Sequence, residues 1–482
     1  MLFNSYEFIF FFLPVVFIVY FFLNKKQFTT VAKIWLVASS LLFYSWWNIQ
    51  YLPILLISLI FNYVVGYLLG KKQSKINRKA LLIIGIVFNV SLLGYYKYFD
   101  FFISNINTVF DSNITLLKLV LPLGISFITF QKIAFLVDSY KRESMDYNFL
   151  NFSLFVTFFP QLIAGPIVHH KEIMPQFAEL QNKNIKYQNI SRGIFIFSIG
   201  LFKKVAIADT LAAWATKGFD QTETLTFFEG WITSLAYTLQ LYFDFSGYTD
   251  MAIGAALLFN IVLPINFNSP YKALDIQDFW RRWHITLSRF LTQYIYIPLG
   301  GNRKGKTRTY INILLVFLIS GFWHGAGWTF IFWGFLHGFA TVVNRYWKSL
   351  GIKLNKYIAW FITFNFVNVA WVFFRATNWE DAIKVLKGMA GVNGVVLPDF
   401  GILSFLENSG VTLGTYFIDL SELVKMLPYL FICMIIVVYC KNSRIMSEHF
   451  RPNILTSVYI SILFVYCILN FNKISEFLYF NF

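Results

Sequence analysis

Long apolar runs recur along the whole of this chain, and no other feature limits its possible folds as strongly. A helix that crosses a membrane needs about 20 mainly apolar residues. Apolar runs near that length or somewhat shorter occupy residues 7–23, 31–47, 51–69, 80–96, 116–136, 149–164, 194–211, 227–242, 251–263, 310–335, 357–374, 427–439 and 455–469. Because several are short, we expect re-entrant or half helices in the middle of the chain. The pattern predicts an all-α polytopic integral membrane protein with about 11 spans.

The composition supports this class of protein and excludes others. Of the 482 residues, 57% are hydrophobic and 13% are charged, whereas about 25% of the residues in soluble domains are charged. The net charge of +16 would suggest a nucleic-acid partner in a soluble protein. Here the basic residues form short clusters between apolar runs, which the positive-inside rule explains. We therefore expect a lipid bilayer around the chain and no nucleic acid.

The basic clusters also orient the chain. The cluster from Lys71 to Lys79 and the cluster from Arg303 to Arg308 should face the cytoplasm. Lys25 and Lys26 follow the first apolar run, whereas a cleavable signal peptide carries its positive charge before that run. We predict that the first run stays in the membrane and that the N-terminus lies outside.

Two polar regions interrupt the apolar pattern, at residues 167–192 and 266–308. Irregular backbone at membrane depth is tolerated where it lines a cavity, so we expect a functional site in the second region, which is also rich in aromatic residues. After residue 374, the sequence Thr377-Asn378-Trp379-Glu380 is typical of a capping box. It predicts a short amphipathic helix on the membrane surface, with Ile383, Leu386 and Met389 on one side. Residues 391–422 should form a loop.

His324 is the strongest candidate for chemistry. It lies in an apolar run and is flanked by glycines and tryptophans, in Gly321-Phe322-Trp323-His324-Gly325. An ionisable residue within a span is a functional-site hypothesis by default. Burial should disfavour the imidazolium, which leaves the neutral form that a general base requires. The alternative is a core histidine that forms a hydrogen bond with a neighbouring helix.

His284 is the second candidate. On a continuous helix, Trp280, His284 and Ser288 share one face, while Arg281 and Arg282 face elsewhere and could meet phosphates or acidic headgroups. The alternative is a cytoplasmic anchor segment with an incidental histidine.

The other polar residues of this region have weaker patterns. His337 is thirteen residues beyond His324, which on one helix is about 20 Å away, so we interpret it as a packing or supporting residue. Asp244, Asp250 and Asp278 are also interpreted as structural or supporting residues, and the first two could pair with Arg281 or Arg282 or orient a histidine. No metal-ligand spacing, phosphate-binding motif or nucleophile elbow is present in the sequence, so we expect no metal.

Several motifs resemble the membrane-bound O-acyltransferases (MBOATs). The two most specific are WRRWH at residues 280–284 followed by YIYIPLGGNR at 294–303, and FWHG at 322–325. Within that family, the chain is most similar to bacterial membrane subunits that O-acetylate alginate or peptidoglycan. Supporting motifs are MLFNS at 1–5, PQLIAGP at 160–166, DFSGY at 244–248, NFNSPY at 266–271 and FFRA at 373–376.

The resemblance implies a helical bundle around a central tunnel, in the cytoplasmic (inner) membrane of a bacterium. His324 would be the catalytic histidine and His284 the second histidine of the family. The donor would be cytoplasmic acetyl-CoA, and an extracytoplasmic partner protein would pass the acetyl group to the glycan. We expect the substrate tunnel and the CoA-facing side to be formed by Trp280, Trp283, Ser288, Trp323, Gly325 and Trp328, and by Arg281, Arg282 and Arg303, respectively.

Residues 1–482 should then form a single transmembrane domain. Its N-terminal helices would occupy residues 1–110, its catalytic core residues 115–376, and a surface helix, a loop and the last spans residues 377–482. Two alternative functions stay open at this point. One is transfer of a D-alanyl group from a carrier protein, as in teichoic acid synthesis, and the other is a proton-coupled transporter. The sequence also leaves open whether the final acceptor is alginate, peptidoglycan or another glycan.

Overall fold

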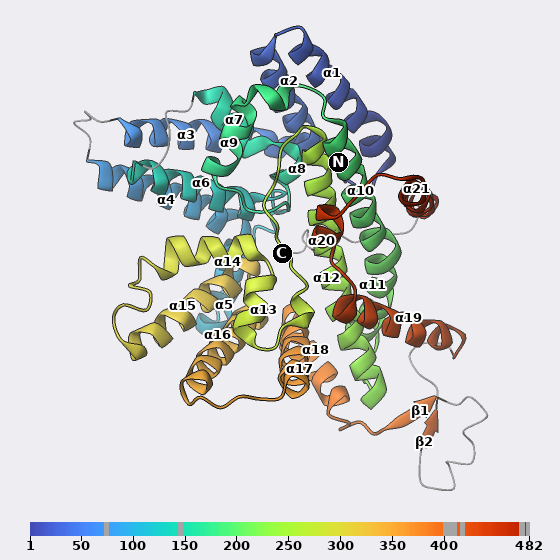
Figure 1. The fold of residues 1–482 in the computed structure, drawn as a ribbon. Coiled ribbons are helices and arrows are strands. Elements are labelled where there is room, and N and C mark those ends of the chain that lie inside the picture. The colour runs from blue at the N-terminus through green and yellow to red at the C-terminus, as the bar shows by residue number, and fades with distance from the viewer. Residues whose placement is uncertain (72–76, 143–147, 399–411, 415–419, 472–477, 479–482) are drawn as a thin grey trace. The chain divides into compact units, whose positions relative to one another are not determined.

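The computed structural model describes residues 1–71, 77–142, 148–398, 412–414, 420–471 and 478 (Figure 1). The described chain is helical almost throughout, which confirms the all-α prediction. Part of the basic cluster from Lys71 to Lys79 lies outside the described residues. The chain divides into two compact units, each assembled from separate stretches of sequence.

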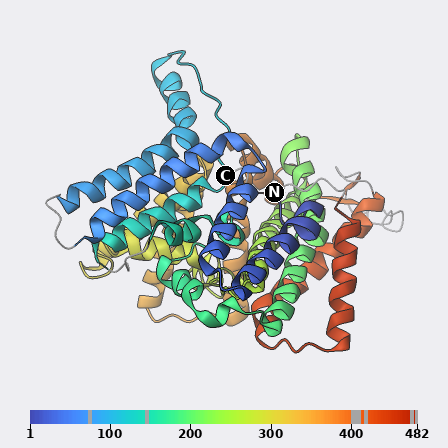
Figure 2. The same ribbon diagram turned by 90° about the horizontal axis from the view of Figure 1, so that it is seen from above.

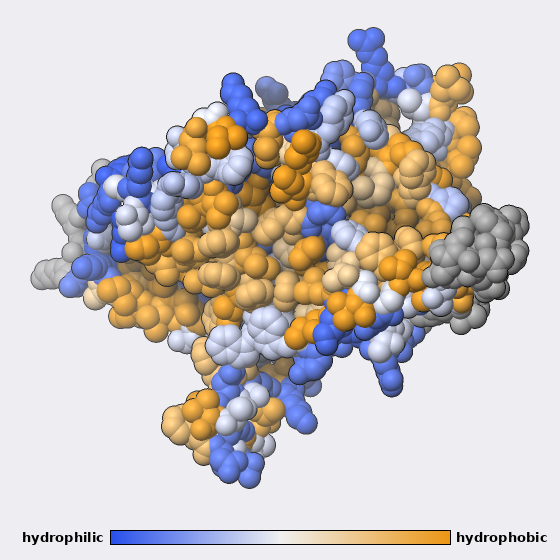
Figure 3. Space-filling view, turned by 90° about the horizontal axis from the view of Figure 1, so that it is seen from below, coloured by the Kyte–Doolittle hydropathy of each residue, from blue (hydrophilic) through white to orange (hydrophobic). Residues whose placement is uncertain are grey.

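Five helices of the described chain are long and apolar enough to cross a membrane. They are Glu7–Lys25, Ile49–Gly70, Arg78–Phe110, Lys356–Arg375 and Leu420–Tyr439. Thr29–Ser45 and Ile454–Leu469 are shorter apolar helices that match two further predicted runs. Apolar side chains make up much of the surface in Figure 3, as expected where a surface faces lipid rather than water. The total of about 11 spans stays a prediction.

The first unit consists of Met1–Leu201, Tyr248–Asn266 and Ser447–Phe471. Its helices are α1 (Leu13–Lys25), α2 (Thr29–Ser45), α3 (Leu52–Gly70), α4 (Arg78–Leu93), α5 (Phe99–Phe110), α6 (Ile125–Tyr140), α7 (Phe149–Thr157), α8 (Phe159–Leu162), α9 (His170–Ala178), most of α10 (Tyr187–Phe202) and α21 (Ile454–Leu469). Helix α5 has no buried residue and projects from its neighbours (Figure 2).

Buried polar contacts connect three helices of this first unit. The Lys132 ammonium of α6 donates a hydrogen bond to Ser58 Oγ of α3 at 2.8 Å. Asn62 of α3 and Asn89 of α4 exchange side-chain hydrogen bonds at 3.1 and 2.6 Å. Such contacts stabilise helix packing where lipid offers no polar partner.

The second unit consists of Phe202–Gly247, Phe267–Met446 and Asn472–Phe482. Its elements are α11 (Asp209–Thr216), much of α12 (Phe227–Leu258), α13 (Ile276–Arg282), α14 (Ile285–Leu291), α15 (Lys306–His324), α16 (Trp328–Ser349), α17 (Lys356–Arg375), α18 (Trp379–Met389), β1 (Val396–Pro398), β2 (Thr412–Gly414), α19 (Leu420–Tyr439) and part of α20 (Ser443–Glu448). Short π- or 3-10-helical turns in the two units are Glu7–Phe12, Ile49–Tyr51, Gly94–Tyr98, Leu180–Lys183, Lys203–Ala208, Lys217–Gln221, Pro270–Lys272 and Thr292–Tyr296.

Several of the predicted spans have different boundaries in the structure. The run 227–242 and residues 251–258 of the next run belong to one continuous helix, α12, of 32 residues, and residues 259–263 lie beyond its end. No proline interrupts the polar stretch between the two runs. The run 310–335 is not one helix. Helix α15 ends at His324, Gly325 and Gly327 have extended backbone, and α16 begins at Trp328.

Glycines bring α15 and α16 into close contact, and the two helices lie side by side in Figure 1. A Cβ atom on Gly321 would overlap the carbonyl oxygen of Phe330 and lie 3.1 Å from the Cα of Gly334. A Cβ atom on Gly334 would likewise overlap the carbonyl oxygen of Phe317. Small residues allow this approach of two backbones, and the resulting hairpin holds His324 at its turn.

Replacing Gly321 with valine should therefore destabilise the hairpin. We expect a loss of about 1–3 kcal/mol, because the added methyl groups would force the two backbones apart. The measurement is thermal unfolding of the detergent-solubilised protein. Gly327→Ala is the matched control, since a Cβ atom there would meet the Phe330 ring at an ordinary 3.5 Å. Equal unfolding temperatures for the two variants would contradict this explanation of the hairpin.

The helix predicted after residue 374 is present as α18, but two details of the prediction are wrong. Its N-cap is Asn378, whose side chain accepts a hydrogen bond from the backbone N–H of Asp381, so the cap lies one residue beyond Thr377. Its buried face contains Ala382, Val385, Gly388 and Met389, while Ile383 is 45% exposed. The predicted loop 391–422 includes the short parallel strands β1 and β2 and the first turn of α19, and much of it lies outside the described residues.

Candidate active site

The structure brings the two candidate histidines together in the second unit. His324 is the last residue of α15 and is 4% exposed, while His284 lies between α13 and α14 and is 0% exposed. Their ring centroids are 6.4 Å apart. Both side chains are therefore held in one buried pocket, although forty residues separate them in the sequence.

The prediction that Trp280, His284 and Ser288 share one helix face is wrong, because the helix breaks. Helix α13 ends at Arg282, and His284 has the left-handed backbone conformation, with φ 44° and ψ 54°. Histidine is one of the few side chains that adopt this region with some frequency. The break turns His284 toward His324, while Ser288 Oγ donates a hydrogen bond to the carbonyl oxygen of Trp280 at 3.2 Å.

Aromatic rings enclose the two histidines. The rings of Trp323, Trp333 and Phe374 lie 4.8, 5.2 and 5.1 Å from the ring of His324. The ring of Phe245 lies 4.9 Å from that of His284. These distances are those of packed aromatic pairs, so the imidazoles lie in an apolar pocket that excludes bulk water.

The other predicted tunnel residues lie at three different places. Trp283 is 3% exposed and packs 5.0 Å from Trp371 and 5.7 Å from Phe279, ring to ring. Gly325 lies against the ring of Phe330, which a Cβ atom would overlap. Trp328 is 55% exposed, so the structure does not gather it with the buried rings around His324.

A cavity of about 280 Å³ lies in the same unit. Arg281 and Arg345 contribute positive charge to its wall, and Trp280 and Phe317 contribute aromatic surface. Its remaining lining residues are Gln277, Ser288, Leu291, Thr292, Tyr296, Ile313, Val316 and Thr341. The prediction included Trp280, Arg281 and Ser288 but missed Arg345, which in the sequence looks like an ordinary basic residue at the end of an apolar helix.

The other two predicted arginines lie elsewhere. Arg282 Nε forms an ion pair with Asp278 Oδ1 at 2.9 Å, one helical turn away. This contact pairs Asp278 with an arginine of its own helix, α13. Arg303 is exposed between the turn Thr292–Tyr296 and α15. Neither residue belongs to the lining of the arginine-containing cavity.

Asp275 connects α13, which contributes to the cavity wall, to α16. Its carboxylate caps α13 by accepting hydrogen bonds from the backbone N–H groups of Gln277 and Asp278, each at 2.9 Å. The same carboxylate forms an ion pair with Lys348 at 2.8 Å. Partial burial by itself would raise the pKa of Asp275, but the hydrogen bonds from Lys348 and the backbone hold it below the usual value. The sign follows from linkage: the carboxylate stabilises the fold above its unfolded-state pKa and loses that contribution as the pH falls through its folded-state pKa.

His337 contacts the cavity through Trp280. The indole Nε1 of Trp280 donates a hydrogen bond to His337 Nδ1 at 3.2 Å, and His337 is 0% exposed. The ring of Trp333 lies 4.8 Å from that of His337. His337 thus packs between the two tryptophans rather than beside His324, and its role as a packing or supporting residue stays a prediction.

The predicted pairing of Asp244 with Arg281 or Arg282 is wrong. The Lys204 ammonium lies 2.6 Å from Asp244 Oδ1 and 2.7 Å from Asp209 Oδ1, and all three side chains are at most 5% exposed. The backbone N–H of Leu478 also points at Asp244 Oδ2, at 3.4 Å. Lys204 was missed, although a lysine inside the apolar run 194–211 was a signal for a buried pair. Asp250 is 7% exposed and belongs to the first unit.

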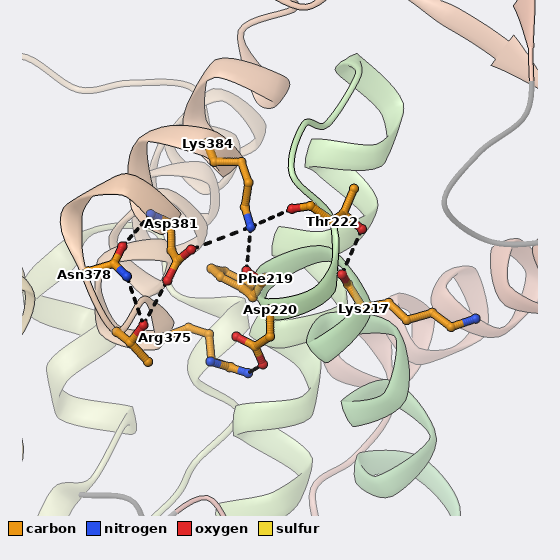
Figure 4. Close-up of polar contacts among 9 residues, drawn as sticks. Lys217, Phe219, Asp220, Thr222, Arg375, Asn378, Asp381 and Lys384 are labelled. Atoms are coloured by element: carbon orange, nitrogen blue, oxygen red, sulfur yellow. Dashed lines mark hydrogen bonds and ion pairs between the residues drawn. The ribbon is translucent and has the colours of Figure 1, made fainter.

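A second polar cluster fixes the end of α17, as Figure 4 shows. Arg375 forms an ion pair with Asp220, and the Lys384 ammonium of α18 donates to the carbonyl oxygens of Phe219 and Thr222 at 2.6 and 2.8 Å. Arg375 directly follows Phe374, the ring that packs on His324. The cluster therefore helps to fix one wall of the histidine pocket.

Within the described ranges, no group of three or more histidine, cysteine or acidic side chains could hold a metal ion. The cavity wall includes two arginine and three aromatic side chains. This arrangement suits an anionic organic ligand, because guanidinium groups bind phosphate and carboxylate in bidentate geometry.

Comparison with known proteins agrees with the motifs. The model of the membrane-bound O-acyltransferase family, MBOAT, matches residues 41–378. A peptidoglycan O-acetyltransferase of Helicobacter pylori is 55% identical over 427 residues, which cover 82% of this chain and 81% of that protein. A probable alginate O-acetylase, AlgI, of Pseudomonas aeruginosa is 39% identical over 81% of this chain and 75% of its own. A teichoic acid D-alanyltransferase of Streptococcus thermophilus is 27% identical over 52% of this chain and 68% of its own.

Proposed function

This chain belongs to the membrane-bound O-acyltransferase family, and we propose that it moves an acetyl group from cytoplasmic acetyl-CoA across the membrane for O-acetylation of an extracytoplasmic glycan. The observation that carries the proposal is the buried pair of His284 and His324, 6.4 Å apart in an aromatic pocket. High similarity to a peptidoglycan O-acetyltransferase over most of both chains supports a cell-wall glycan as the final acceptor.

In the proposed reaction, His324 is the general base. A hydroxyl oxygen of the acceptor attacks the carbonyl carbon of the thioester, and His324 takes the hydroxyl proton. The bond between carbon and sulfur then breaks, the new ester forms, and the CoA sulfur leaves and takes up a proton. We assign His284 to one of two tasks at this centre, either donating a hydrogen bond to the thioester carbonyl oxygen or handing the proton to the leaving sulfur.

The donor side of the proposal uses the cavity with two arginines. Arg281 and Arg345 line it, and we assign them to the phosphates of CoA, since guanidinium groups bind phosphate strongly and stay charged. We assign to Arg345 the phosphate-binding role that we expected for Arg282, because Arg282 forms an ion pair with Asp278. The basic cluster from Arg303 to Arg308 follows the positive-inside rule, which supports a cytoplasmic position for this end of α15.

The acceptor side requires a further component in this proposal. We propose that an extracytoplasmic acetyltransferase partner passes the acetyl group to the glycan, in a bacterial cytoplasmic membrane where the N-terminus faces outside. D-alanyl transfer is the second candidate. The identity to a teichoic acid D-alanyltransferase is lower and covers about half of this chain, so similarity favours acetyl transfer.

The proposal is tested with purified protein and isotopically labelled acetyl-CoA. We expect label to leave CoA, and Arg345→Ala to raise the KM for acetyl-CoA about 10- to 100-fold, because a hydrogen bond to a charged group contributes roughly 1.5–3 kcal/mol. Arg308→Ala, which removes an exposed arginine of α15 outside the cavity lining, is the matched control and should leave the KM unchanged.

Two results would contradict the proposal. If acetyl-CoA stays intact while a pH gradient drives solute into proteoliposomes, the protein is a transporter. If label leaves an acyl carrier protein but never CoA, the donor is the carrier-bound acyl group of the second candidate.

A further inference from the structure

A second cavity of the second unit, of about 340 Å³, is lined by α16, α17 and the start of α13. It shares no lining residue with the arginine-containing cavity. Val343 and Ile362 in its wall are 45% and 53% exposed, so the cavity opens at the protein surface. We call it the α16–α17 groove, after the two helices that the turn 350–355 connects (Figure 1).

The wall of the α16–α17 groove has the polarity and the length of a lipid chain. Each helix presents one face to it, with apolar residues spaced three or four apart. These residues are Ala340, Val343 and Trp347 on α16 and Ala359, Ile362 and Phe366 on α17. Seven residues of helix extend about 10 Å, whereas one leaflet contributes about 15 Å to the hydrocarbon core. A single acyl chain therefore matches the groove.

Positive charge collects at one end of the groove. The stretch from residue 345 to residue 356 contains Arg345, Lys348, Lys353 and Lys356 and no acidic residue. Lys348 forms an ion pair with Asp275 of the groove wall. Lys353 and Lys356 are exposed and flank Leu354, which lines the groove. An anionic group at this end would meet two lysines beside the mouth of an apolar channel.

Aromatic residues at the same turn mark the membrane surface. Tyr346 and Tyr357 are 56% and 69% exposed, and the Trp347 indole donates a hydrogen bond to the carbonyl oxygen of Ile352 at 3.1 Å. Tyrosine and tryptophan are enriched where lipid headgroups meet water, and basic turns favour the cytoplasmic side. The turn 350–355 thus has the composition of a segment at the headgroups of the cytoplasmic leaflet.

We infer that the α16–α17 groove binds an anionic glycerophospholipid of the cytoplasmic leaflet. One acyl chain lies between the two helices, and the phosphate lies at Lys353 and Lys356. Basic pockets between membrane helices on the cytoplasmic side recognise anionic headgroups in this way. A zwitterionic lipid offers the same chain without the net negative charge. This lipid site goes beyond the proposed function and does not depend on acetyl transfer.

The headgroup is tested by titrating the purified full-length protein in detergent with phosphatidylglycerol or phosphatidylcholine. Native mass spectrometry measures the bound lipid. The wild type should bind phosphatidylglycerol about 5- to 25-fold more tightly, because each lysine near an anionic headgroup contributes about fivefold. Lys353→Gln/Lys356→Gln should lose this preference and keep its affinity for phosphatidylcholine. Lys304→Gln/Lys306→Gln is the matched control, since it removes two exposed lysines of the same unit outside the groove lining.

The chain site is tested with Ala359→Trp, whose indole would fill the groove. Its affinity for both lipids should fall about 10-fold or more, because each methylene that is no longer buried costs about fourfold. Ile358→Trp is the matched control, since Ile358 is 53% exposed on α17 and outside the groove lining. Glycerophosphoglycerol, the headgroup without acyl chains, should not displace phosphatidylglycerol at equal concentration.

Three results would overturn the inference. Equal affinities of the wild type for the two lipids would exclude an anionic headgroup site, and unchanged lipid binding by Ala359→Trp would exclude the chain site. An equal loss of preference in the two lysine double variants would show that overall charge, and not the groove, selects the lipid. If Ala359→Trp fails to accumulate, that comparison of the double variants decides.

Discussion

Replacing His324 with alanine should lower the rate of acetyl transfer by about 100- to 10,000-fold, which is the contribution of a positioned general base. The acceptor hydroxyl is a weak nucleophile until its proton is removed, and His324 is the proposed base within the aromatic pocket. The measurement is transfer of label from acetyl-CoA by equal amounts of purified variant and wild-type protein. His449→Ala is the control, because His449 is exposed and belongs to the first unit.

The role of His284 can be separated from that of His324 with a double variant. A donor to the developing oxyanion is typically worth about 100- to 1,000-fold in rate, so His284→Ala alone should have a large effect. If the two histidines act on one reacting centre, the double variant should be little slower than His324→Ala, because residues that act as a unit are strongly non-additive. A His324→Ala variant that keeps activity within a factor of about three would contradict the assignment of the base.

Removing the Lys204 ammonium should destabilise the protein more than any other single charge change that we propose. Lys204→Met leaves Asp209 and Asp244 buried without their shared cation, and breaking a buried pair in this way costs about 3–5 kcal/mol. The three side chains are at most 5% exposed, and both contacts are shorter than 2.8 Å. Activity should fall as well, because Asp244 directly precedes Phe245, whose ring packs on His284.

The measurement is the midpoint of thermal unfolding in detergent, together with the abundance of the protein in the membrane. Lys217→Met is the matched control. Lys217 pairs with Glu422 at 3.0 Å, but the two side chains are 37% and 34% exposed, so its loss should cost less than about 1 kcal/mol. Similar unfolding midpoints for Lys204→Met and Lys217→Met would show that the buried cluster contributes no special stability.

The histidine pair could be predicted from sequence because both residues are unusual where they occur. His324 interrupts an apolar run, and His284 follows two arginines between tryptophans. Their proximity could not be predicted. It depends on the left-handed backbone of His284 and on the break after His324, and helical spacing alone favoured an unbroken helix through Trp280, His284 and Ser288.

The charged partners show a similar limit. A buried lysine such as Lys204 is detectable in sequence, but its partner Asp244 is forty residues away and could equally have paired with Arg281. In the sequence, Arg345 resembles a cytoplasmic anchor residue. In the structure α16 packs against α15, and Arg345 lines the same cavity as Arg281. Trp328 is a different case: its place near His324 in the sequence suggested a tunnel wall, it is 55% exposed, and its role stays a prediction.

Mass spectrometry of the cell-wall and exopolysaccharide glycans tests the central claim most directly. The comparison uses the native bacterium with the wild-type chain, without it, and with His324→Ala at equal abundance, so that any partner protein is present throughout. Our account predicts glycan O-acetyl esters with the wild-type chain and their loss in the other two strains. Unchanged acetylation in all three strains, or loss of D-alanyl esters in place of acetyl esters, would contradict it.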